Sequence, residues 1–328
     1  MLWLFFVLSA GVGVTTVQAE TLIVGNKVDN TLSFFDLATG EEVHRRQTVR
    51  SPHEVALSPD GRTVVVVSYI DGDYIGRILE AYDVETATPT KTITLADQSA
   101  PHGMVWLPGS ERLLVTTQEP ANVVAVDVAR GEVTDSLSTG ETDSHLIAQT
   151  KDGSRAYVTN RGSDTFTALD TAALTEIATV PSDAGTEAID VRPDGSVIVV
   201  GNRKAETLTF YDGESLKLVD RLNMGYDPVR LAYKPDATAF VVADYTNGRV
   251  NVHDAGTRKA IATIDLSDAG IEEPAHLMFS PSGDRLFVSG QKNGVVGEYD
   301  TSNWRLRRTL AAGVGADGLA LSDVVLVR

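Results

Sequence analysis

The sequence contains no cysteine. This absence excludes disulfide bridges, thiolate metal ligands and cysteine nucleophiles. It also excludes membrane anchoring through a lipidated N-terminal cysteine. The groups that remain for binding or catalysis are hydroxyls, carboxylates, basic side chains and the imidazoles of six histidines.

Positive charge is scarce. Lys and Arg number 28 against 45 Asp and Glu, which gives a formal net charge of −17 at pH 7 and a pI near 4.7. Binding to a phosphate backbone needs a basic surface, so we expect no nucleic-acid partner. The solubility of an exported protein is a sufficient reason for the acidity.

Long apolar runs are missing beyond the N-terminus, so we expect no membrane span in the mature chain. Residues 2–14 are almost entirely apolar or small, and the sequence Val-Gln-Ala before Glu20 places small residues at −3 and −1 of a cleavage site. This pattern is typical of a secretory signal peptide, and a buried strand is the alternative. We predict a signal peptide over residues 1–19, a single domain over 20–328, and a periplasmic or secreted location.

Aromatic residues make up only 6% of the chain. Together with abundant Gly and Thr, this composition favours many short strands over helices. The clearest stretch is 143–181, where β-prone segments alternate with turns rich in Gly, Asp and Ser. Four strands are predicted there, over residues 145–150, 156–160, 166–169 and 176–180.

The same unit recurs along the chain. An apolar run that ends in Asp occurs seven times, at spacings of 42 to 47 residues: Asp36, Asp83, Asp127, Asp170, Asp212, Asp254 and Asp300. An Asp side chain can hydrogen-bond the backbone two residues on, so we assign these residues to turns and not to catalysis. Repeats of about 44 residues with four strands each predict an all-β propeller.

The two ends of the chain predict how the ring closes. Residues 21–36 align with 155–170, so the domain begins at the second strand of a repeat. Residues 317–322, near the C-terminus, resemble the first-strand segment 53–58 and can supply the missing first strand. We therefore predict seven four-stranded antiparallel blades, with one blade completed by N- and C-terminal strands, which removes an open edge. Residues 324–327 also resemble a second strand, for which that blade has no room.

Several short motifs carry a family resemblance. Residues 157–160 read Tyr-Val-Thr-Asn, residues 58–62 read Ser-Pro-Asp-Gly-Arg, and residues 101–103 read Pro-His-Gly. In these motifs the chain resembles the YVTN-repeat β-propellers, over residues 21 to about 322. The resemblance implies a seven-bladed, often exported propeller. It implies little about activity, because members of that family bind diverse partners.

Potential functional residues gather where the inner strands begin. In a propeller these strands line the central channel, so their first residues converge on one mouth. At one register the successive repeats carry His53, His102, His145 and Glu187, and the terminal repeat carries Asp317. Arg230 and His276 lie one position later, so we expect them to face the other way along their strands. His44 and His253 fall in outer and third strands and are interpreted as structural.

Imidazoles that converge with a carboxylate suggest a metal site. His53, His102 and His145 are the candidate ligands, for Cu or Zn. Two alternatives remain open at this point: an organic-ligand site, or histidines that only line the channel and hydrogen-bond the backbone.

The connections between second and third strands lie on the same face and carry a basic residue in nearly every repeat. These residues are Lys27, Arg77, Arg161, Arg203, Lys204, Arg249 and Lys292. Guanidinium groups suit the recognition of carboxylates and phosphates. The pattern predicts a cationic collar that binds a small anionic ligand, and scattered loop charge is the alternative.

Three functions follow from these candidates. The first is an exported binding or scaffold propeller that holds a small anionic ligand or an envelope protein at its mouth. The second is a lactonase-like hydrolase, because seven-bladed lactonases are similar in size and in inner strands that begin with Pro-His. The third is a histidine-lined metal-binding propeller. The sequence has no G-x-S-x-G elbow and no H-E-x-x-H motif, which favours the non-enzymatic reading.

Overall fold

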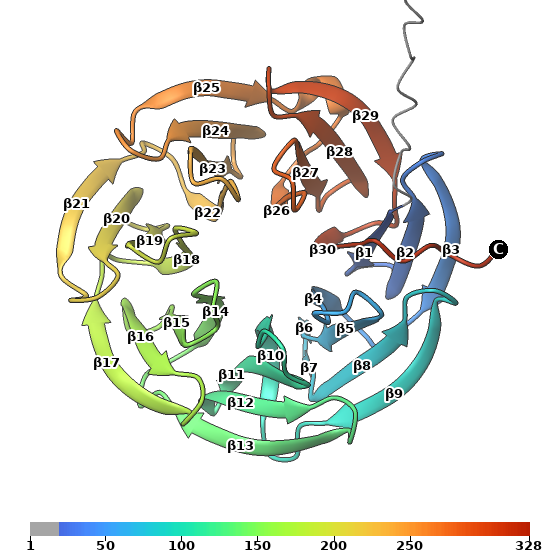
Figure 1. The fold of residues 1–328 in the computed structure, drawn as a ribbon, viewed down its shortest axis with the longest axis horizontal. Coiled ribbons are helices and arrows are strands. Elements are labelled where there is room, and N and C mark those ends of the chain that lie inside the picture. The colour runs from blue at the N-terminus through green and yellow to red at the C-terminus, as the bar shows by residue number, and fades with distance from the viewer. Residues whose placement is uncertain (1–19) are drawn as a thin grey trace, which may run out of the picture.

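Seven four-stranded antiparallel sheets form a ring around a central axis in the computed structural model of the protein, which describes residues 20–328 (Figure 1). The predicted all-β, seven-bladed propeller is confirmed. The predicted signal peptide, residues 1–19, lies outside the described residues. No helix in the described part of the chain is long and apolar enough to cross a membrane.

Each blade runs from an inner strand at the axis to an outer strand at the rim. Blade 1 consists of β30 (Ala316–Ser322), β1 (Thr21–Asn26), β2 (Thr31–Asp36) and β3 (Glu41–Gln47). Blade 2 consists of β4 (Pro52–Leu57), β5 (Thr63–Ser68), β8 (Ile78–Asp83) and β9 (Thr88–Thr94). Blade 3 consists of β10 (Ser99–Trp106), β11 (Arg112–Glu119), β12 (Ala121–Asp127) and β13 (Glu132–Ser138).

The other four blades follow in chain order. Blade 4 consists of β14 (Ser144–Gln149), β15 (Arg155–Asn160), β16 (Thr165–Asp170) and β17 (Thr175–Pro181). Blade 5 consists of β18 (Thr186–Val191), β19 (Val197–Asn202), β20 (Thr207–Asp212) and β21 (Leu218–Asn223). Blade 6 consists of β22 (Pro228–Tyr233), β23 (Ala239–Asp244), β24 (Arg249–Asp254) and β25 (Ala260–Asp265), and blade 7 of β26 (Pro274–Phe279), β27 (Arg285–Gly290), β28 (Val295–Asp300) and β29 (Arg305–Ala311). In blade 4 the predicted bounds differ from those observed by one residue at most.

The apolar core lies between the blades. Each of the seven clusters of buried apolar side chains within residues 20–328 joins two neighbouring blades. The second strands are buried on both faces, whereas the outer strands alternate between exposed and half-buried residues. A strand sandwiched between two sheets must be apolar on both sides, which explains the continuous Val-rich runs that mark each repeat.

Ring closure follows the prediction. β30 pairs antiparallel with β1, with Leu321 opposite Leu22, so the N- and C-terminal strands share one sheet. The second strand-like segment, 324–327, does not join the sheet. Instead it runs across blades 1 and 2, where the Val327 N–H donates to the Glu85 carbonyl at 2.7 Å and Leu326 is buried.

The Tyr-Val-Thr-Asn segment of β15 shows what the repeated motif does. Thr159 Oγ1 accepts from the Leu146 N–H at 3.0 Å and donates to the Glu187 carbonyl of the next blade at 2.9 Å. The buried Asn160 amide donates to the hydroxyls of Thr165 and Thr167. The threonine therefore joins two blades, and the asparagine joins two strands within one blade.

The seven repeated Asp residues cap turns, as predicted. In Asp36 and Asp300 the carboxylate accepts from the N–H two residues on, at 2.8 and 2.9 Å. In the other five the partner lies three residues on: Asp83, Asp127, Asp170, Asp212 and Asp254. The expected spacing of two residues was therefore wrong for most of them, although the carboxylate accepts from a turn N–H in all seven.

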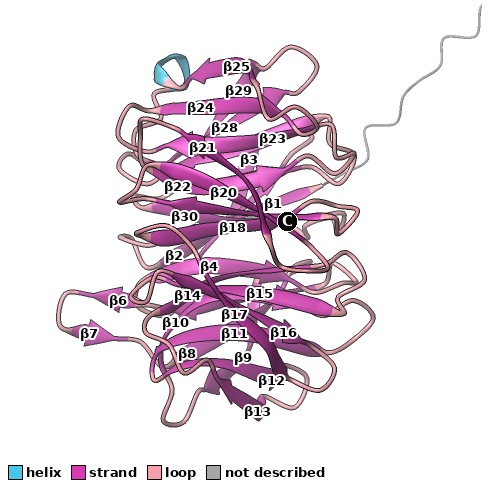
Figure 2. Cartoon of the chain, turned by 90° about the vertical axis from the view of Figure 1, so that its left-hand side faces the viewer, coloured by secondary structure: helices cyan, strands magenta, loops and turns pink. Residues whose placement is uncertain are grey.

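Blade 2 departs from the repeat between its second and third strands. The connection there, residues 69–77, is longer than the equivalent connections of the other blades. It forms a hairpin of β6 (Ile70–Asp71) and β7 (Tyr74–Ile75). Figure 2 shows this hairpin projecting from one side of the ring. The short 3-10 helix η1 (Ser267–Ala269) follows the outer strand of blade 6.

Candidate functional site

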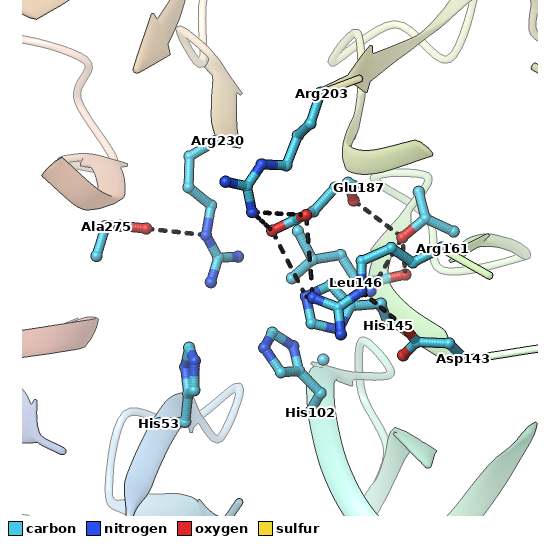
Figure 3. A network of polar contacts seen from close by, with 12 residues as sticks. His53, His102, Asp143, His145, Leu146, Arg161, Glu187, Arg203, Arg230 and Ala275 are labelled. Atoms are coloured by element: carbon cyan, nitrogen blue, oxygen red, sulfur yellow. Dashed lines mark hydrogen bonds and ion pairs between the residues drawn. The ribbon is translucent and has the colours of Figure 1, made fainter. Parts of the chain in front are cut away.

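One mouth of the central channel contains a cavity of about 230 Å³. The structure brings His53, His102, His145 and Glu187 together there (Figure 3). They belong to a ring of seven residues, one from each inner strand, which we call the inner-strand ring. Its members are His53, His102, His145, Glu187, Val229, Ala275 and Asp317, and all of them line the cavity.

A second ring surrounds the first. It consists of the residue that follows the buried part of each second strand, and we call it the second-strand ring. Its members are Lys27, Tyr69, Gln118, Arg161, Arg203, Tyr245 and Gln291, and all except Gln118 line the cavity. Sequence reasoning missed its four uncharged members, although the same register in each repeat would have identified them.

The predicted cationic collar is therefore only partly formed. Lys27, Arg161 and Arg203 line the cavity because they belong to the second-strand ring. Arg77 and Arg249 lie further along their connections and are exposed outside it. The remaining two predicted members lie elsewhere: Lys204 borders a separate depression, and Lys292 pairs with Glu272 at 2.6 Å.

The expectation that Arg230 and His276 face away from the channel was wrong. The inner strands have an irregular register directly after their first residue, between Pro228 and Leu231 in blade 6 and between Pro274 and His276 in blade 7. A bulge re-aims the residues around it, so two consecutive residues can turn toward the mouth. The same irregularity brings in Glu54, which sequence reasoning missed.

Glu54 and Arg230 form a buried ion pair across the channel. Arg230 Nη2 of blade 6 donates to Glu54 Oε1 of blade 2, and its Nε donates to the Ala275 carbonyl at 2.9 Å. Burial raises the pKa of Glu54, but the Arg230 guanidinium and the neighbouring His53 and His276 more than offset this effect and hold that pKa well below its usual range. Glu54 is therefore a carboxylate at neutral pH.

Three imidazoles pack in a row along one side of the mouth, with their rings tilted against each other. The ring centroids of His102 and His145 lie 3.6 Å apart, and those of His53 and His102 lie 4.5 Å apart. The Tyr69 ring packs edge-on against His102 at 4.8 Å. This close approach depends on Gly103, where a Cβ would lie only 2.8 Å from the His145 carbonyl of the next blade.

His102 and His145 are uncharged at neutral pH. Burial is the largest cause that lowers the pKa of His102 well below its ordinary value, and His145 and His53 add to it. Burial and the Arg161 guanidinium lower the pKa of His145 in the same way. Burial also lowers the pKa of His276 to about 4, despite the opposing effect of Glu54. A neutral imidazole can accept a hydrogen bond or bind a metal.

His145 is already engaged by side chains of the second-strand ring. Its Nδ1 lies 2.9 Å from Gln118 Nε2, and its Nε2 lies 3.4 Å from Arg161 Nη1. Arg203 holds the neighbouring carboxylate, because its Nη1 donates to Glu187 at 3.0 Å while its other donors bind Asp227. These contacts hold the His145 end of the row, whereas Nδ1 of His53 and Nδ1 of His102 have no hydrogen-bond partner within residues 20–328.

The cavity walls and the fold together define the class of protein: a seven-bladed propeller with a polar axial pocket. The sequence profile described as "Lactonase, 7-bladed beta-propeller" matches residues 13–253. The chain belongs to this family.

Two of the solved structures that resemble this chain show how widely the fold is used. One is hydrazine synthase from Kuenenia stuttgartiensis, with 19% identity, a TM-score of 0.71, and coverage of 80% of this chain and 87% of that chain. The other is a functionally unknown protein from Desulfotomaculum acetoxidans, with 16% identity, a TM-score of 0.79, and coverage of 92% and 98%. At these identities the likeness shows the fold alone. Among curated proteins the sequence has no match.

Proposed function

We propose that this chain is an exported binding propeller of the YVTN-repeat type, which holds a small organic anion in its mouth cavity. The observation that carries the proposal is a set of cationic donors left without partners. Lys27 Nζ packs over the Tyr69 ring at 5.2 Å, and neither it nor Arg230 Nη1 has a hydrogen-bond acceptor within residues 20–328. Donors held in a cavity favour a ligand that supplies oxygen acceptors.

The size and polarity of the cavity support a compact ligand. About 230 Å³ is below the roughly 300–1,000 Å³ of pockets for drug-sized molecules. Four cationic side chains line it, together with three imidazoles and two carboxylates, Glu187 and Asp317. A small carboxylate or hydroxy acid matches this lining, because guanidinium groups bind carboxylates in a fixed geometry.

Calorimetric titration with a panel of monocarboxylates, dicarboxylates, sugar acids and phosphate monoesters tests this proposal. We expect at least one of these anions to bind, and Lys27→Gln to weaken that binding about tenfold, which corresponds to about 1.4 kcal/mol. Arg77→Gln is the matched control, because Arg77 is exposed outside the cavity. Absence of binding across the panel, or equal affinity in Lys27→Gln, would reject an anion site.

Hydrolysis of a lactone is the second candidate function. Family membership favours it, and neutral His102 and His145 could accept a proton beside the cationic side chains. Turnover of a lactone panel, followed as acid release, is the measurement. We expect His102→Gln to remove any turnover above buffer, and a rate that the substitution does not change would place the reaction outside this site.

Export is proposed from the N-terminal sequence. Residues 2–14 are almost entirely apolar or small, and small residues precede Glu20 at the positions that signal peptidases read. Mass spectrometry of the protein from a periplasmic extract should find a chain that begins at Glu20. An intact Met1 in that extract would contradict cleavage at this site.

A further inference from the structure

Two imidazoles from different blades point one nitrogen each toward the same carboxylate. His53 Nδ1 lies 3.5 Å from Glu54 Oε1, and His102 Nδ1 lies 4.0 Å from that oxygen. The three ligating atoms all lie within 4.8 Å of one another. Two ligands that sit about 2.0–2.1 Å from one tetrahedral ion are about 3.4 Å apart, so these donors need to close by only a small distance.

The two imidazole nitrogens among the candidate ligand atoms are buried and make no hydrogen bond within the described residues. His53 Nδ1 and His102 Nδ1 have no hydrogen-bond partner within residues 20–328, and neither has Oδ1 of the neighbouring Asp317. His102 is 2% exposed and Asp317 is fully buried. A buried polar atom without a partner lowers the stability of the fold, so several such atoms at one place point to a site that binds an ion or ligand.

We propose that His53, Glu54 and His102 bind one divalent transition-metal ion at the blade 2 side of the mouth. Imidazole nitrogen and carboxylate oxygen are ligands that zinc and related metals prefer. The ligands lie in the irregular starts of the inner strands of blades 2 and 3, and paired residues flank them on both sides: Pro52 and Val55 in β4, and Pro101 and Met104 in β10. With only three protein ligands, one coordination position faces the cavity.

The neighbours of Glu54 fit a metal ligand. His276 Nδ1 lies 3.6 Å from the second carboxylate oxygen of Glu54, and such an outer contact can orient a metal ligand. Asp317 Oδ2 lies 3.4 Å from His53 Nδ1, where it adds negative charge beside the proposed ion. Arg230 is the exception, because its positive charge shares Glu54 Oε1 and opposes a cation there. Removal of that charge should therefore strengthen metal binding.

This site differs from the metal set expected from sequence. The sequence placed His145 beside His53 and His102, but both nitrogens of His145 lie within hydrogen-bonding distance of Gln118 or Arg161. Glu54 takes its place, since its Oε1 lies close to Nδ1 of both other histidines. Arg230 borders both this site and the organic-anion site, whereas Lys27 is proposed for the organic-anion site and not as a metal ligand.

Zinc titration of the chelator-stripped full domain tests the site, with Zn²⁺ as the sole added ligand. We expect one Zn²⁺ per chain, with binding at least tenfold weaker in both His102→Gln and His53→Gln. His44→Gln is the matched control, because His44 lies on outer strand β3, where it contacts the Val327 carbonyl, and it should bind Zn²⁺ like the wild type. Lys27→Gln should also retain the metal, which separates this test from that of the anion site.

Arg230→Gln should change the Zn²⁺ affinity in the opposite direction. A substitution that only disrupted the fold would weaken Zn²⁺ binding and would not strengthen it. We expect its Zn²⁺ affinity to rise several-fold, and Zn²⁺ to raise its melting temperature more than that of the wild type. Substoichiometric binding to the wild type, or equal affinity in His102→Gln and His53→Gln, would overturn the proposal. Loss of binding in His44→Gln would assign the metal to the surface and overturn it equally.

Discussion

At the residue scale, the polar groups on the inner strands are constrained by burial more than by their neighbours in sequence. Asp190 of β18 shows this below the mouth. Its carboxylate accepts from the Tyr233 N–H of blade 6 at 2.7 Å and from its own neighbour Val191 at 2.8 Å. Burial nevertheless outweighs both hydrogen bonds and raises the pKa of Asp190 to about 6. The side chain therefore links two blades in a way that depends on its protonation.

Asp190→Asn should change how stability depends on pH. The pKa of Asp190 is higher in the folded protein than the ordinary 3.8. Its contribution to the free energy of unfolding is therefore fully present below about pH 4 and is lost as pH rises through about 6. Urea unfolding at pH 4, 5, 6 and 7 measures this change. Over this range the free energy of unfolding of the wild type should fall by about 2 kcal/mol relative to that of the variant. A difference that stays constant with pH would show that Asp190 does not titrate there.

At the element scale, second strands supply both the core and the links between blades. Thr159 of β15 is the clearest case, because one hydroxyl satisfies the Leu146 N–H and reaches the Glu187 carbonyl of blade 5. Thr116 of β11 makes the equivalent contacts with the Gly103 N–H and the His145 carbonyl. These hydroxyls position the backbone of two members of the inner-strand ring. The repeated threonine is therefore structural and indirectly shapes the mouth.

Thr159→Val should destabilise the domain by about 1–3 kcal/mol, because valine has a similar shape but leaves a buried N–H without an acceptor. Urea unfolding monitored by tryptophan fluorescence measures the loss. Thr92→Val on the exposed outer strand β9 is the control and should cost almost nothing. Equal stability of the two variants would mean that the hydroxyl contributes no net free energy.

At the scale of the whole molecule, closure of the ring determines whether the mouth exists. β30 covers the inner edge of β1 and contributes Asp317 to the cavity. The segment after β30 lies over blades 1 and 2 without joining a sheet, where Leu326 is buried and the Val327 N–H donates to the Glu85 carbonyl. The two parts of the C-terminus therefore differ in importance, although both resemble strands in sequence.

Two truncations separate these contributions. A chain that ends at Ser322 should keep a cooperative thermal transition and melt about 2–6 °C lower, since it loses little burial. A chain that ends at Gly315 exposes an unpaired strand edge, and we expect it to lose cooperative unfolding and to aggregate. Differential scanning calorimetry distinguishes these outcomes. A cooperative transition in the shorter chain would show that six blades and an open seventh are sufficient.

The sequence by itself determined the number of blades, the four strands of each, and the closing pair. These features depend on local chemistry: β-prone runs, Asp-capped turns and a spacing of 42 to 47 residues. It also brought His53, His102 and His145 to one register.

Only the tertiary structure decided which side chains meet. The irregular start of the inner strands turned Arg230 and His276 inward, and the channel brought Glu54 of blade 2 against Arg230 of blade 6. Contacts across an axis depend on the radius of the ring and on small backbone shifts, and neither is encoded in any one repeat.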